Sequence, residues 1–169
     1  MTIEIWDLHF HIWDVSKNTI SGHDSTQLFA PNDKLVYSWR EYERDFDLIG
    51  TGYVHKGGVF VEALSACHIG LSGFKFSEAC IAETSWALGQ LEQSKKQYML
   101  VSSAPLEYPE IGSILSKLAE NPKVRGIRQI INYNPSWPRN EKLGNLLENR
   151  HWKRPTGSWA TTDCVMTSS

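Results

Sequence analysis

The sequence has few of the features that mark several common classes of protein. Its three cysteines, Cys67, Cys80 and Cys164, are widely spaced and form no CxxC pair, which argues against a disulfide framework and favours a reducing compartment. No apolar run approaches the roughly 18 residues of a transmembrane helix. The first residues lack a basic region followed by an apolar stretch, so we expect no signal peptide and a cytoplasmic location.

The sequence also lacks a large excess of positive or negative charge. Lys and Arg number 17 against 19 Asp and Glu, and the formal net charge is −2 at pH 7. No basic stripe or cluster is present, so we expect no nucleic-acid partner. The sequence contains no glycine-rich phosphate loop, no GxSxG elbow and no Cys/His nucleophile pair. These absences exclude the motifs most often seen at phosphate sites and at nucleophile sites.

What the chain does have is the balance of a globular domain, with 169 residues of which 41% are hydrophobic. Strand-like and helix-like segments alternate along it. Predicted strands cover 3–11, 57–63, 98–107 and 124–132, and predicted helices cover 38–50, 79–96, 108–122 and 140–152. Four strand-helix units predict an α/β fold with a parallel sheet and outer helices, either an open curved sheet or part of a barrel.

Three stretches fit this pattern poorly. Residues 16–36 are polar and predict a long surface loop. Residues 64–78 separate a strand from its helix by more than the usual 2–6 residues or so, which indicates a lid or an insertion. Residues 154–169 show no hydrophobic period, so we expect a disordered or aberrant tail beyond a domain at 1–153.

The stretch "EIWDLHFHIWD" (4–14) carries the most specific chemistry. On a strand, alternate residues share a face, so Asp7, His9 and His11 are predicted to project together, with both faces of the strand buried. Neutral imidazoles on one rigid face suit zinc and similar divalent ions. The alternative is that both histidines are core residues. Their place at the carboxyl end of a predicted parallel strand favours the metal site.

Further candidates follow later strands. Glu62 ends the second predicted strand and suits a metal ligand or a general base, or else a solvated loop carboxylate. Arg128 lies near the end of the fourth and suits a clamp on substrate oxygens, or else a structural salt bridge. Trp137 and Arg139 lie in a proline-bounded loop that either floors a pocket or forms a surface turn. The lone histidines His55, His68 and His151 are expected to be exposed.

Together these pieces resemble the amidohydrolase superfamily, in its amidohydrolase-related (family 2) branch, and the fuconolactonase-like members in particular. The stretches that carry the resemblance are "DLHFHIWD", "VFVEA", "CIAETSWAL", "SAPLE" and "NPKVRGIRQIINYNPSWPRN". They cover residues 3 to about 152 without 64–78. The branch includes sugar-lactone hydrolases and a decarboxylase.

The resemblance implies a (β/α)8 TIM barrel whose first-strand metal ligands match His9 and His11, with zinc the expected ion. It implies catalytic positions at Glu62 and Arg128, and substrate contacts at Arg128, Trp137 and Arg139. A full barrel takes about 250 residues, and the later family elements, a histidine on a middle strand and an aspartate on the last, have no counterparts here. We therefore expect the first four βα units of a barrel, as a truncated or alternatively spliced product.

Three functional hypotheses follow. The first is a metal-dependent hydrolase that opens a lactone or similar cyclic ester with metal-activated water. The second is an inactive fragment that binds metal weakly or not at all and forms a homo-oligomer that covers its open edges. The third is a metal-dependent decarboxylase of the same superfamily. We expect the hydrolase as the family function, with absent or severely reduced activity in this chain.

Overall fold

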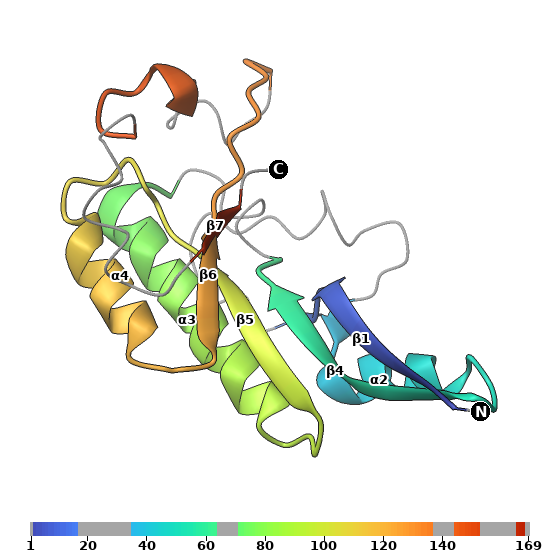
Figure 1. Cartoon of the computed structure of the whole chain (residues 1–169). Helices are drawn as coiled ribbons and strands as arrows, with labels where there is room; N and C mark the ends of the chain where they lie inside the picture. The colour runs from blue at the N-terminus through green and yellow to red at the C-terminus, as the bar shows by residue number, and fades with distance from the viewer. Residues whose placement is uncertain (1, 17–34, 64–70, 137–143, 153–164, 168–169) are drawn as a thin grey trace.

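The alternating segments assemble into a parallel sheet whose strand order is β1-β4-β5-β6-β7 (Figure 1). The computed structural model describes residues 2–16, 35–63, 71–136, 144–152 and 165–167. The sheet strands are β1 (Ile3–Phe10), β4 (Tyr53–Val61), β5 (Gln97–Ser103), β6 (Val124–Arg128) and β7 (Val165–Thr167). The helices are α2 (Trp39–Asp47), α3 (Gly73–Leu91) and α4 (Ile111–Ala119). A separate two-stranded pair joins β2 (Trp13–Asp14) to β3 (Val36–Tyr37).

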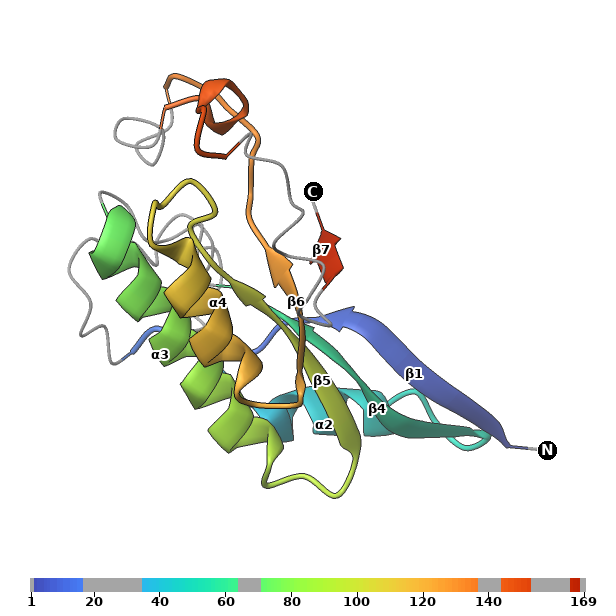
Figure 2. The ribbon, with the colours of Figure 1, turned by 60° about the vertical axis from the view of Figure 1, so that its left-hand side comes forward.

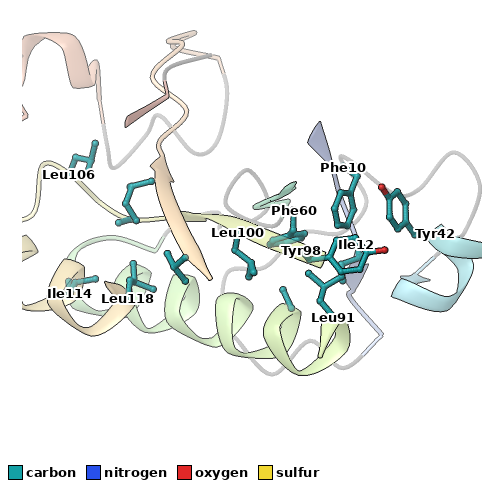
Figure 3. Close-up of a cluster of buried hydrophobic side chains, with 14 residues drawn as sticks. Phe10, Ile12, Tyr42, Phe60, Leu91, Tyr98, Leu100, Leu106, Ile114 and Leu118 are labelled. Atoms are coloured by element: carbon teal, nitrogen blue, oxygen red, sulfur yellow. The ribbon is translucent and has the colours of Figure 1, made fainter. Parts of the chain in front are cut away.

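The described helices cover one face of this sheet, and the main core lies between the two layers (Figure 2). Phe60 of β4 and Leu100 of β5 face Ala87 and Leu91 of α3, and all four are at most 2% exposed. Tyr42 brings α2 into the same cluster (Figure 3). The opposite face is more open, because Met99, which alternates with these core residues along β5, is 41% exposed.

The parallel α/β sheet with outer helices confirms the predicted class. Apart from the short β2–β3 pair, the strands lie in the sheet in the order of the sequence. Among the described residues, however, the sheet is open, with β1 and β7 at its edges.

The helix at α2 is confirmed within three residues at each end. A capping box closes its first turn, in which the Glu41 carboxylate accepts a hydrogen bond from the Ser38 backbone N–H at 2.7 Å. The predicted strands at β5 and β6 are also present, although both end four residues earlier than expected. Strand β4 begins at Tyr53 rather than at residue 57.

Two other predictions about elements are wrong, and a third differs at its end. Helix α3 begins at Gly73, so residues 73–78 belong to a helix rather than to a lid or insertion, and 64–70 lie outside the described residues. The predicted helix over 140–152 is a single 3-10 turn at Leu146–Glu148 within its described part, 144–152. The predicted surface loop 16–36 ends one residue earlier than expected, because Val36 belongs to β3, and its part at 17–34 lies outside the described residues.

Strand β1 is not buried on both faces, as the sequence suggested. It lies at the sheet edge, and Ile3, Trp6 and Leu8 are 52%, 46% and 73% exposed. The prediction failed because an apolar run does not reveal whether another layer of the fold covers each face of the strand.

Within the predicted tail, residues 165–167 form β7, which pairs in parallel with β6. The tail's residues 154–164 and 168–169 lie outside the described residues.

Candidate functional site

The imidazoles of His9 and His11 converge at the carboxyl end of β1. Their Nε2 atoms lie 3.2 Å apart, and the two rings meet edge to face. His11 Nδ1 lies 2.8 Å from the Val61 carbonyl oxygen of the neighbouring strand β4. Because a carbonyl only accepts, Nδ1 carries the proton, and in neutral His11 the Nε2 atom presents its lone pair toward His9.

This spacing matches two ligands of one metal ion. Zinc–nitrogen bonds of about 2.0–2.1 Å to both Nε2 atoms would subtend an angle of about 100–106°, close to tetrahedral. The hydrogen bond from His11 Nδ1 to Val61 resembles the outer contacts that fix a metal-bound histidine in the correct tautomer. Without a metal, His9 Nε2–H can donate to His11 Nε2 instead, so the contact alone does not require an ion.

Asp7 does not join these two histidines, contrary to the expectation from alternation. Its Oδ2 atom accepts a hydrogen bond from the Tyr42 hydroxyl on the helix-covered face, at 3.1 Å. The reason is a shift in the pairing of β1 with β4, where Asp7 pairs with Gly58 but Phe10 with Phe60. One extra residue in β1 reverses the alternation, so Asp7 and Phe10 share the face on which Tyr42 packs.

Glu62 and Arg128 form an ion pair across the ends of β4 and β6. An Arg128 Nη1 donates to Glu62 Oε1 at 3.1 Å and lies 3.3 Å from the Glu62 carbonyl oxygen. The Glu62 side chain is only 1% exposed, and that of Arg128 is 16% exposed. The solvated-loop alternative for Glu62 is therefore wrong, whereas the structural salt bridge considered for Arg128 is present.

Both members of this pair lie near His11. Burial is the main factor that lowers the pKa of His11, with a further lowering from His9 and Arg128, while the contact with Val61 and the charge of Glu62 oppose it. His11 is therefore held neutral at pH 7, which is the state that a metal ligand needs. The carboxyl ends of β1, β4 and β6 thus bring four of the predicted site residues to one edge of the sheet.

A buried carboxylate that the sequence did not reveal, that of Glu83, helps to hold the chain at this edge of the sheet. Glu83 of α3 is 5% exposed, and its Oε1 accepts a hydrogen bond from the backbone N–H of Ala63 at 2.7 Å. That amide directly follows Glu62, so Glu83 fixes the backbone from which Glu62 projects. An acidic residue within an amphipathic helix gave no signal for this role, because such residues are usually solvated.

The third ligand of a metal site does not appear in the described part of the chain. Across residues 2–16, 35–63, 71–136, 144–152 and 165–167, no group of three or more His, Cys, Asp or Glu side chains could hold a metal ion. The residues therefore fit two positions of a metal ion and leave the others to water, substrate or other ligands.

The other predicted residues are two loop residues and three lone histidines. Some lie outside the described residues, and the others are less exposed than expected. Trp137 and Arg139 lie in 137–143, outside the described residues, as does His68. His55, on β4, was expected to be exposed, but it is buried, with only 9% of its surface exposed. His151 is partly buried rather than exposed.

Fold and site together define an α/β protein with a parallel sheet, a histidine pair and a buried ion pair at the carboxyl edge of its strands. No family model, curated protein or solved structure matches the chain. None of the helices in the described residues is both long and apolar enough to cross a membrane.

Proposed function

We propose that this chain carries the first-strand half of an amidohydrolase-type metal site, and that its reaction is the hydrolytic opening of a lactone or similar cyclic ester. The observation that carries the proposal is the 3.2 Å separation of the two Nε2 atoms at the carboxyl end of an N-terminal parallel strand. The wider proposal is that the sheet corresponds to the opening part of a TIM barrel, in which sites lie at this edge.

A divalent ion held by His9 and His11 would polarise a carbonyl and lower the pKa of a bound water. The chain's own residues prepare this edge for such chemistry. Val61 holds the His11 ring in one tautomer, so the lone pair on Nε2 stays available to a metal ion. The Glu62 carboxylate lies in the same region, fixed by Arg128, and is suited to accept a proton from a nucleophile.

The expected strength of this site is limited by its ligand count. A catalytic zinc site normally has about three protein ligands. We therefore propose weak metal binding and low lactonase activity for this chain.

Zinc titration of the purified 169-residue chain by calorimetry tests the metal site. We expect one Zn²⁺ per chain, with affinity falling at least about tenfold in His9→Ala and in His11→Ala, since even losing an outer-sphere partner costs about that much. His151→Ala, which removes a histidine elsewhere, is the matched control and should bind as the wild type does. Equal affinity in the wild type and His9→Ala would overturn the ligand assignment.

The reaction is tested separately with galactono-1,4-lactone, by the acid released in a pH-indicator assay with and without Zn²⁺. We expect slow, zinc-dependent acid release that is lost in His11→Ala. Zinc binding without acid release would leave the metal site in place and overturn the lactonase. Release of carbon dioxide from a carboxylated substrate would instead identify a decarboxylase.

A further inference from the structure

The histidine pair at the end of β1 supplies only part of the coordination of a zinc ion. A structural zinc ion almost always has four ligands in a tetrahedron, and His9 and His11 provide two of them. In the part of the chain that the structure describes, no third His, Cys, Asp or Glu side chain joins these two histidines. Two positions of the ion are therefore left to ligands from elsewhere.

Two carboxylates near the pair are already occupied. Asp7 Oδ1 accepts a hydrogen bond from the His9 backbone N–H at 3.0 Å, and its Oδ2 accepts one from the Tyr42 hydroxyl at 3.1 Å. Glu62 is 1% exposed and is paired with Arg128. Neither carboxylate is placed to complete the site within one copy of the chain.

Strand β1 presents the pair to a second molecule. It pairs with β4 alone and lies at the edge of the described sheet (Figure 1). His9 is exposed, and its neighbour Leu8 is 73% exposed. A strand edge of this kind is a ready docking place for another chain.

The charges of β1 do not oppose such an approach. The strand carries two acidic residues, Glu4 and Asp7. Glu4 Oε1 lies 3.3 Å from Lys56 Nζ, and Asp7 is held by its two hydrogen bonds. Two copies therefore bring their imidazoles together without uncompensated acidic side chains of β1 facing each other.

A second copy of the chain is the partner that these observations fit best. Symmetric dimers place the same surface of both chains at a two-fold axis, so an ion on that axis receives the same two Nε2 atoms from each copy. The second pair arrives already spaced for a tetrahedral ion, and both of its ligands are gained in one association. Separate side chains or waters must be ordered one by one.

We infer that zinc, when it is scarcer than the chain, joins two copies through His9 and His11 of each. The inference rests on the proposed metal site and adds the partner that completes it. In the joined form imidazoles hold all four positions, as in structural zinc sites, so none is left for a reacting water. Excess zinc reverses the association, because each chain then takes an ion of its own.

Sedimentation velocity tests this at a high chain concentration, with Zn²⁺ raised from none to a large excess. We expect monomer in EDTA, the most dimer near half an equivalent of zinc per chain, and a falling share of dimer in excess zinc. An ion shared between two chains gives this rise and fall. The inference would be overturned by monomer at every zinc concentration, by a dimer that zinc does not affect, or by a dimer whose share never falls in excess zinc.

Calorimetry separates this inference from the proposed site. Zinc binding by a chain that stays monomeric would leave the metal site in place and overturn only the shared ion. No zinc binding at all would overturn both.

The His9→Ala variant leaves each chain one proposed ligand, and the exposed side chain contributes little to packing. We expect it to stay monomeric at every zinc concentration, whereas His151→Ala, the matched control, should dimerise as the wild type does. If His9→Ala dimerised with zinc as the wild type does, the four-histidine site would be wrong. Far-UV circular dichroism checks that each variant is folded, and if one is not, the rise and fall in the wild type still decides.

Cobalt in place of zinc reports the geometry of the joined form. Co²⁺ absorbs visible light strongly in a tetrahedral site and weakly in an octahedral one, so the spectrum distinguishes four imidazoles from two imidazoles and several waters. We expect strong absorption at half an equivalent of Co²⁺ in the wild type and not in His9→Ala. Weak absorption at every ratio in the wild type would contradict the four-histidine site.

Discussion

At the scale of single residues, the half-buried imidazole of His11 and the buried one of His55 carry most of the pH dependence that we expect near neutrality. The pKa values of His11 and His55 are both lowered, in each case mainly by burial. In the unfolded chain a histidine has a pKa of about 6.5 and takes up a proton more readily. The stability due to these neutral rings is therefore complete above about pH 6.5 and is lost as the pH falls toward the lower pKa values of the folded state.

The measurement is the urea midpoint of unfolding at pH 7.5 and at pH 5.5. We expect a lower midpoint at pH 5.5, and a smaller difference in His55→Phe, which removes one of the two titrating rings. Glu43 does not complicate this range. Burial alone would raise its pKa, but hydrogen bonds from Ser94, Tyr98 and Lys96 lower it, so its contribution is lost only in more acidic solution. Identical midpoints at both pH values would contradict the assignment of two neutral imidazoles.

At the scale of elements, the pairing of β1 with β4 depends on the absence of a side chain at residue 58. A Cβ atom on Gly58 would lie 2.2 Å from the Asp7 carbonyl oxygen and 3.3 Å from Phe10 Cδ1. The first contact is with backbone and cannot be relieved by a side-chain rotation. Any larger residue there must push β1 away from β4, and with β1 it must move His11 away from Val61.

We therefore predict that Gly58→Ala lowers the free energy of unfolding by about 1–3 kcal/mol, the usual cost of overpacking. It should also weaken zinc binding, because β1 carries both proposed ligands. Gly89→Ala is the matched control. It lies within α3, where a Cβ would meet nothing within 4 Å, and it should stabilise the protein by about 0.5–1 kcal/mol. Urea unfolding of the wild type and the two variants measures both changes in the free energy of unfolding. A Gly58→Ala variant as stable as the wild type would contradict the tight pairing of β1 with β4.

The elements also show what the sequence can and cannot predict. Helix α2 and strands β5 and β6 could be found because the helical spacing of aromatic residues and short apolar runs are local signals. The convergence of His9 and His11 followed from their spacing at the end of a strand. The position of Asp7 did not, because a shift in strand pairing leaves no local mark. The first turns of α3 were missed because Phe76 is held by contacts within a small separate cluster with Leu71, rather than by a regular apolar stripe.

At the scale of the whole molecule, the described strands are protected very unequally. Strand β5 lies between β4 and β6, and its Leu100 is fully buried under α3. Strand β1 has a paired neighbour on one side only, and three of its apolar side chains are about half exposed or more. The proposed metal ligands thus lie at the end of an edge strand, where a bound ion would add to local order.

Amide hydrogen exchange followed by NMR measures this difference directly. We expect the slowest exchange in β5, close to the rate set by global unfolding, and much faster exchange in β1, because edge amides can open locally. Saturating zinc should slow exchange at the carboxyl end of β1 by mass action, and the His9→Ala variant should not respond. If β1 were as protected as β5 in the metal-free protein at low concentration, the edge described here would be wrong. If that protection appeared only at high concentration, a second copy of the chain would be covering the edge, as expected for a homo-oligomer.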